Sequence, residues 1–100
     1  MTLKTIPFDI AAELSTEADI QEYFSQVMAD GDTDEIIRAL SHIARARGMA
    51  KLAADTGLGR ESLYKTLSAG SKPRFETILK ITRALGLRLT AESQSKHAPA

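Results

Sequence analysis

The chain has 100 residues and no cysteine, and its 13 basic and 13 acidic side chains cancel to a formal net charge of zero. This length fits one domain with a single core, and the lack of cysteine excludes a disulfide framework and a thiol-based zinc site. No apolar run is long enough to span a membrane, and the first residues lack the basic-then-apolar order of a signal peptide, so we expect a cytoplasmic protein without membrane contact.

The net charge hides a division of the chain into two parts. Residues 1–35 carry nine acids and one base, whereas residues 36–100 carry twelve bases and four acids. A basic segment suits a polyanion such as nucleic acid, and an acidic segment would repel DNA and attract a basic protein. For the acidic part, a merely solvated helix face remains an equal alternative.

Capping residues and apolar spacing predict two helices in the first half. Ser15 or Thr16 begins the first, which ends near residue 29, and Asp32 or Thr33 begins the second, which ends at Gly48. The apolar stripe of the first helix is Ile20, Tyr23, Phe24, Val27 and Met28. One face of the second carries Ile36, Ile37, Leu40, Ile43 and Ala44.

Three further helices are predicted, over residues 49–56, residues 60–68 and a segment from Pro73 to Gly86. The fifth helix carries Phe75, Ile78, Leu79, Ile81 and Leu85. After it, residues 87–90 alternate like a short strand, and residues 92–100 are expected to have no fixed structure. The predicted fold is therefore an all-α bundle of about five helices with a short C-terminal strand.

Residues 49–70 have the pattern of a helix-turn-helix. Small Ala53 lets a second helix cross closely, and Gly57 suits a tight turn that needs positive φ. Leu58 fills the corner, and Leu63 and Leu67 give the second helix one apolar stripe. In this motif the second helix can lie in a DNA major groove, so the sequence predicts DNA binding.

The outward positions of that helix support the same interpretation. They hold Arg60, Glu61, Tyr64 and Lys65, a set that a helix serving only the core does not need. The alternative is an ordinary helical hairpin with a solvated face. We therefore expect an acidic N-terminal arm and helix over residues 1–31, a helix-turn-helix DNA-binding domain over residues 32–91, and a flexible tail over residues 92–100.

From about residue 7 to residue 90 the chain resembles the addiction-module antidote proteins, HigA-like antitoxins with a phage-repressor (Xre/Cro) type of helix-turn-helix. The stretches that carry the resemblance are Pro7-Phe8-Asp9, Ile43-Ala44-Arg45-Ala46-Arg47-Gly48-Met49, Thr56-Gly57-Leu58, Arg60-Glu61-Ser62-Leu63-Tyr64-Lys65 and Ala84-Leu85-Gly86-Leu87. The resemblance implies an antitoxin that neutralises a RelE/ParE-like toxin encoded beside it and represses their shared operon as a dimer.

The resemblance to phage repressors implies which side chains face base edges, namely Arg60, Glu61, Tyr64 and Lys65. Arg60 and Lys65 can donate to guanine O6 and N7. Glu61 can accept from cytosine N4 or can instead orient Arg60. Tyr64 suits a thymine methyl group or a phosphate.

Contacts to phosphates or to the minor groove are implied for Lys51, Gly59, Ser62, Lys72 and Arg74. Lys51 takes over from Met49, which stands where many such repressors have a phosphate-binding Gln. Gly59 starts the recognition helix where Ser is commoner, so its N-cap is weak. Arg74 stands at a helix start, where a positive charge is mildly unfavourable, and this favours a minor-groove role over that of a plain surface arginine.

Two protein contacts are also expected. The toxin would bind residues 8–31, where acidic groups alternate with apolar ones, although apolar residues at helical spacing more often belong to a core. Two copies would meet along Leu87 and Leu89 and the outer surface of the last helix, because one recognition helix reads only a few base pairs. The alternative function is a protein-interaction module with no operator preference. The candidate toxin contacts are Ile20, Tyr23, Phe24 and Val27.

Other motifs in the sequence do not support a metal site or a nucleotide-binding loop. Residues 30–34 imitate the start of a calcium loop, but Glu35 and Ser41 stand where that loop needs Gly and Glu, and helix capping explains the acids better. His42 and His97 have no thiol or spaced carboxylate to make a metal site. The Gly57-Leu58-Gly59 segment lacks the third glycine of a dinucleotide loop. We expect no enzyme activity, cofactor or metal.

Overall fold

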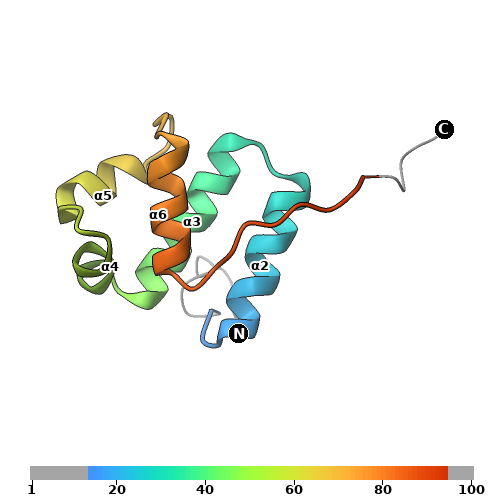
Figure 1. The fold of residues 1–100 in the computed structure, drawn as a ribbon, viewed down its shortest axis with the longest axis horizontal. Helices are drawn as coiled ribbons and strands as arrows, with labels where there is room; N and C mark the ends of the chain where they lie inside the picture. Colours follow the sequence, from blue (N-terminus) through green and yellow to red (C-terminus); the bar gives the residue numbers. More distant parts are fainter. Residues whose placement is uncertain (1–13, 95–100) are drawn as a thin grey trace, which may run out of the picture.

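The computed structural model describes residues 14–94, and this part of the chain is helical without any strand (Figure 1). The predicted Pro7-Phe8-Asp9 stretch, the remainder of the N-terminal arm and His97 lie outside it. Its helices, in chain order, are α2 (Glu17–Asp30), α3 (Thr33–Arg47), α4 (Met49–Thr56), α5 (Arg60–Thr66) and α6 (Phe75–Ala84). The all-α class is confirmed, and the helices begin and end within about two residues of their predicted bounds.

Capping boxes fix the starts of α2 and α3. The hydroxyl of Thr16 accepts a hydrogen bond from the Asp19 N–H at 3.0 Å, and the Asp19 carboxylate accepts one from the Thr16 N–H at 3.3 Å. Asp32 and Glu35 form the same reciprocal pair at 2.9 and 2.8 Å. Asp32 and Glu35 thus satisfy main-chain N–H groups at the start of α3, which confirms capping as the role of these two acids.

Gly31 allows α2 and α3 to follow one another closely. Its φ of −81° is accessible to any residue, so the requirement is one of space. A Cβ at this position would stand 2.7 Å from the Val27 carbonyl oxygen and 3.2 Å from the Glu35 Cβ. The glycine is therefore needed for the sharp connection between the two helices.

The core forms around α3, with α2 packed on one side and α4, α5 and α6 on the other (Figure 1). An exposed ion pair between Arg47 and Glu17, 3.3 Å apart, joins the end of α3 to the start of α2. Because α2 contributes two deeply buried side chains, it is part of the core. The buried apolar residues are Leu14, Ile20, Phe24, Ile37, Ala39, Leu40, Ile43, Ala44, Met49, Leu52, Leu63, Leu67, Ile81 and Leu85.

The predicted C-terminal strand is wrong. Residues 87–94 run past α6 and across α2 without a strand partner in the described part of the chain (Figure 1). Leu87 and Leu89 are half-buried against the core, whereas Arg88 and Thr90 are exposed. The alternation therefore reflects packing on helices, since a strand also needs a neighbouring strand to complete its hydrogen bonds.

Within residues 14–94, no helix combines the length and the apolar character that crossing a bilayer requires. The same residues contain no group of three histidine, aspartate or glutamate side chains placed to share a metal ion.

Candidate nucleic-acid interface

A tight turn joins α4 to α5 and sets the direction of α5. Gly57 adopts the left-handed conformation with φ +77°, and its N–H donates to the Ala53 carbonyl oxygen at 2.9 Å. No atom lies within 4 Å of where a Cβ at Gly57 would stand, so the need for glycine comes from the backbone conformation alone. The predicted positive φ is confirmed.

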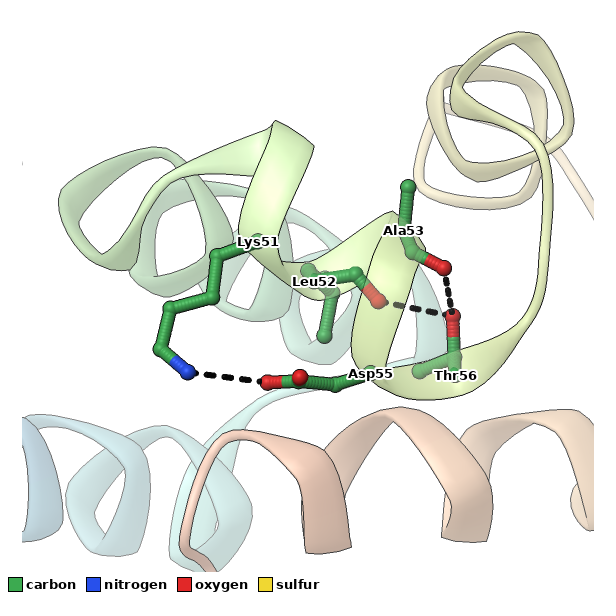
Figure 2. Close-up of polar contacts among 5 residues, drawn as sticks. All are labelled: Lys51, Leu52, Ala53, Asp55 and Thr56. Atoms are coloured by element: carbon green, nitrogen blue, oxygen red, sulfur yellow. Dashed lines mark hydrogen bonds and ion pairs between the residues drawn. The ribbon is translucent and has the colours of Figure 1, made fainter.

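Thr56, which had no role of its own in the predicted motif, stabilises this turn. Figure 2 shows its hydroxyl beside two carbonyl oxygens of α4, at 2.8 Å from Leu52 O and 3.5 Å from Ala53 O. The same hydroxyl oxygen accepts a hydrogen bond from the Leu58 N–H at 3.2 Å. This bond is partly buried, so its loss would leave the Leu58 N–H poorly paired. A threonine at the last position of a helix, just before glycine, is the signal that could have revealed it.

The helix α5 has one buried and one exposed face. Leu63 is fully buried and Leu67 nearly so, as their spacing predicts. The side chains on the other face are exposed, and Tyr64 keeps 45% of its surface in solvent although it is aromatic. The exposed set is Arg60, Glu61, Ser62, Tyr64 and Lys65. The structure therefore brings the four predicted base-reading residues onto one short helix and leaves them open to a partner.

The start of α5 carries no side-chain cap, since Gly59 is the N-cap residue and no side chain bonds the first N–H groups. The predicted weak N-cap is confirmed. On the neighbouring helix α4, Lys51 forms an ion pair with Asp55, with Nζ and Oδ2 3.1 Å apart (Figure 2). The Lys51 side chain is 73% exposed, so the pair is weak and its ammonium group can exchange the carboxylate for another anion.

The loop between α5 and α6 presents two cations. It is fixed by the Ser71 hydroxyl, which donates to the Thr66 carbonyl oxygen at 2.6 Å, and by Gly70 with φ +80°. Lys72 and Arg74 are both exposed. Arg74 is the N-cap residue of α6 but makes no side-chain cap, so its guanidinium group is left for solvent or a partner.

Phe75 departs from the predicted apolar stripe of the last helix, because 68% of its surface is exposed. It is the first residue of α6, where the helix emerges from the loop, and the buried face begins further along at Ile81 and Leu85. Met28 near the end of α2 is likewise 42% exposed. The apolar character and spacing of residues do not show by themselves that residues at the end of an apolar stripe are exposed.

The candidate toxin-binding residues lie on the inner side of α2. Ile20 and Phe24 are buried core residues, whereas Tyr23 and Val27 are half-buried and pack against that core. The Tyr23 ring lies 6.4 Å from the ring of His42 on α3, and burial raises the pKa of the tyrosine hydroxyl. In this conformation Ile20 and Phe24 do not face a partner.

The described residues thus define a small all-helical protein in which two short helices and a tight turn hold an exposed polar helix face. Comparison with protein families gives its class. A family model described as probable addiction module antidote protein matches residues 4–93, and the chain belongs to that family. An antidote of an addiction module implies a cognate toxin as its partner.

A similar protein is found in Haemophilus influenzae. It is described as uncharacterized and is 40% identical over 98 residues, which cover 98% of this chain and the whole of the relative. No solved structure matches the chain.

Proposed function

We propose that this protein is the antitoxin of a type II toxin-antitoxin module, and that it represses its own operon by sequence-specific DNA binding through a helix-turn-helix. The observation that carries the proposal is the exposed polar face of α5. Arg60 and Lys65 stand on a helix whose opposite face is anchored by buried Leu63. A short helix held in this way can enter a major groove with its cations toward base edges.

The side chains of α5 supply the donors and acceptors that base reading needs. Arg60 and Lys65 donate to guanine O6 and N7, and Glu61 accepts from cytosine N4 or holds Arg60 in position. Tyr64 contacts a thymine methyl group or a phosphate. Because Gly59 has no side chain and lies at the uncapped start of α5, its N–H can approach a phosphate, and Ser62 adds a hydroxyl donor.

Cations outside α5 would add affinity and set the register on the duplex. Lys51 and Lys72 are exposed and contact phosphates, and Lys51 would leave Asp55 to do so. Arg74 extends into the adjacent minor groove, where a narrow A·T-rich segment concentrates negative potential. The lack of a cap at α6 supports this role, since serine or threonine at that position would stabilise the helix better.

The partner toxin would be of the RelE/ParE-like kind and would meet the acidic outer surface of α2. Its exposed acids are Glu17, Asp19, Glu22 and Asp30. Deleting α2 is a poor test because the helix contributes Ile20 and Phe24 to the core. Charge reversal at Glu22 and Asp30 keeps the core intact and should weaken neutralisation of the toxin in co-expression. Full neutralisation by that double variant would place the toxin contact elsewhere.

The test of DNA reading compares Arg60→Ala with Arg38→Ala, which removes another exposed arginine, on α3. Loss of a bidentate contact to guanine costs about 1–3 kcal/mol on the operator and reduces preference for it over random DNA. The Arg38 variant should keep that preference. If the Arg60 variant discriminates as the wild type does, α5 does not read bases through this residue. If even the wild type shows no operator preference, the protein is an interaction module with this fold.

A further inference from the structure

An apolar groove lies between the start of α3, the loop before α6 and the start of α6, which stand at the same end of the molecule (Figure 1). Its volume is about 700 Å³, which is within the range of sites that hold a ligand or a partner's side chains. Ile36 and Ile78 line it on the core side and are half-buried. Phe75 lines it on the solvent side.

The exposure of Phe75 distinguishes this groove from an ordinary surface hollow. With 68% of its surface in solvent, Phe75 is the most exposed large apolar residue in residues 14–94. An aromatic ring left in water forgoes the favourable free energy of burial, and the proposed DNA contacts do not involve it. Exposed aromatic residues of this kind are frequent anchors at protein–protein interfaces, so the groove has the character of a docking site.

The rim of the groove is acidic. Asp32 and Asp34 line it on the α3 side, and Lys72 is the single basic residue that lines it within the described chain. No ion pair joins Lys72 to either acid in residues 14–94, and the Asp34 carboxylate has no hydrogen-bond partner there. Residues 14–37 as a whole carry seven acidic side chains and no basic one. This end of the molecule therefore attracts a basic protein and repels DNA.

We propose that the groove receives an apolar side chain of the toxin, beside a basic side chain of the toxin that pairs with Asp34. This inference rests on the proposed function, which supplies the toxin as partner and the acidic face of α2 as the other part of the contact. Asp30 ends α2 two residues before Asp32, so the acidic face of α2 continues to the rim of the groove. The apolar side chain of the toxin then covers Phe75.

A second hollow, along α6, lies on the other side of Phe75 and fits this partner less well. It is lined by Phe75 and Leu79 together with two acids and two bases, so its charge does not select a basic protein. The charge pattern thus assigns the toxin to the groove beside α3. The charged residues of the second hollow are Asp55, Glu76, Lys80 and Arg83.

The test measures binding of the full chain to the protein encoded beside its gene, by surface plasmon resonance at two salt concentrations without DNA. Phe75→Ala should raise the dissociation constant about tenfold or more, because it removes the anchor of the contact. Leu79→Ala, which truncates an apolar residue of the second hollow, is its control and should bind as the wild type does. Lys72 stays unchanged because it is a proposed DNA contact.

Charge reversal tests the rim separately. Asp34→Lys should slow association and make it less sensitive to salt, because an attraction between opposite charges is lost. Glu76→Lys is the matched control, since Glu76 is also an acid in the first turn of a helix but lines the second hollow. Its association rate should fall less than that of the Asp34 variant.

A fluorescence measurement keeps the proposal testable if truncation disturbs the fold. The chain has no tryptophan, so Phe75→Trp introduces a single reporter that keeps an aromatic ring at this position. Its emission should move to shorter wavelength when the toxin is added, because the toxin covers the ring. Leu79→Trp is the control for any tryptophan of the toxin itself and should show no such shift.

The outcomes separate this proposal from the proposed function. If the wild type does not bind the neighbouring protein, the antitoxin function fails. If the wild type binds it and the Phe75→Ala and Asp34→Lys variants bind equally well, the antitoxin function stands and the groove proposal is overturned. Losses as large with Leu79→Ala and Glu76→Lys would move the contact to the second hollow and overturn it too. A Phe75→Ala variant that binds the toxin normally but changes the mass of the free protein would assign the groove to a second copy instead.

Discussion

The hydroxyl oxygen of Thr56 accepts the main-chain N–H of Leu58 at 3.2 Å, which joins the last residue of α4 to the turn before α5. The same hydroxyl donates to the Leu52 carbonyl oxygen at 2.8 Å. One buried side chain therefore links the end of α4 to the turn that leads into α5 and helps to orient the exposed face of α5.

Replacing Thr56 by valine keeps the shape of the side chain and removes this link. The Leu58 N–H then loses its partner in a partly buried place, and the free energy of unfolding should fall by about 1–2 kcal/mol. Urea denaturation followed by circular dichroism measures it. Thr82→Val is the matched control: Thr82 is also buried, but its hydroxyl donates only to Leu79 O within α6, so a smaller loss is expected. Equal losses would show that the Thr56 bond to the turn adds nothing.

Gly57 and Gly59 distinguish a requirement for an unusual backbone conformation from a requirement for room around the residue. A Cβ at either position would meet no atom within 4 Å, yet Gly57 has φ +77° and Gly59 has φ −71°. Gly57→Ala should therefore lower stability by about 1–2 kcal/mol. Gly59→Ala should lower it less, because the smaller entropy of the unfolded chain offsets part of the cost of the poorer N-cap that alanine makes. Thermal unfolding of the two variants checks the difference. Similar melting temperatures for both would contradict a strained left-handed residue in the turn.

Gly31 presents the opposite case, because its backbone conformation is ordinary and its surroundings are tight. Alanine at an unobstructed site with φ near −81° would stabilise the protein by reducing the entropy of the unfolded chain. Here the new Cβ would lie 2.7 Å from the Val27 carbonyl oxygen, so Gly31→Ala should destabilise by about 1–3 kcal/mol. A stabilised variant in chemical denaturation would mean that α2 and α3 can separate without cost.

Arg74→Ser should raise the stability of the protein and lower its affinity for DNA. Serine can cap the first N–H groups of α6 and removes a positive charge from the helix N-terminus, so stability should rise by about 0.5–1 kcal/mol. Affinity for an operator with A·T-rich flanks should fall, because no guanidinium enters the minor groove. Denaturation and DNA titration on the same sample test both effects. A variant that gains stability and keeps full affinity would make Arg74 a plain surface residue.

Much of the helical framework was predictable because it depends on local chemistry. Caps at Thr16 and Asp32, positive φ at Gly57 and the buried leucines of α5 all follow from neighbouring residues in the chain. The C-terminal strand could not be judged in this way, since alternation looks the same whether a segment pairs with a strand or lies on helices. Nor could the sequence show that Phe24 of α2 is buried in the core, because an apolar stripe on a helix can pack either against a partner protein or against the protein's own core.

In the candidate site, too, features set by local spacing were predictable and features set by three-dimensional geometry were not. Exposure of Arg60, Glu61, Tyr64 and Lys65 follows from their spacing around Leu63, so one helical period was enough to predict it. The position of Thr56 before Gly57 indicates a side-chain bond at the helix end, but its partner, the Leu58 N–H, depends on the geometry of the turn and needed the structure.

The proposed function depends most directly on recognition by this protein of its own operator. Fluorescence anisotropy can compare DNA from upstream of its gene with random DNA of equal length and composition, at two salt concentrations. We predict tight binding that favours the upstream DNA at both concentrations and weakens steeply with salt as phosphate contacts are screened. Weak and equal binding to the two DNAs would mean that this protein does not repress its own operon.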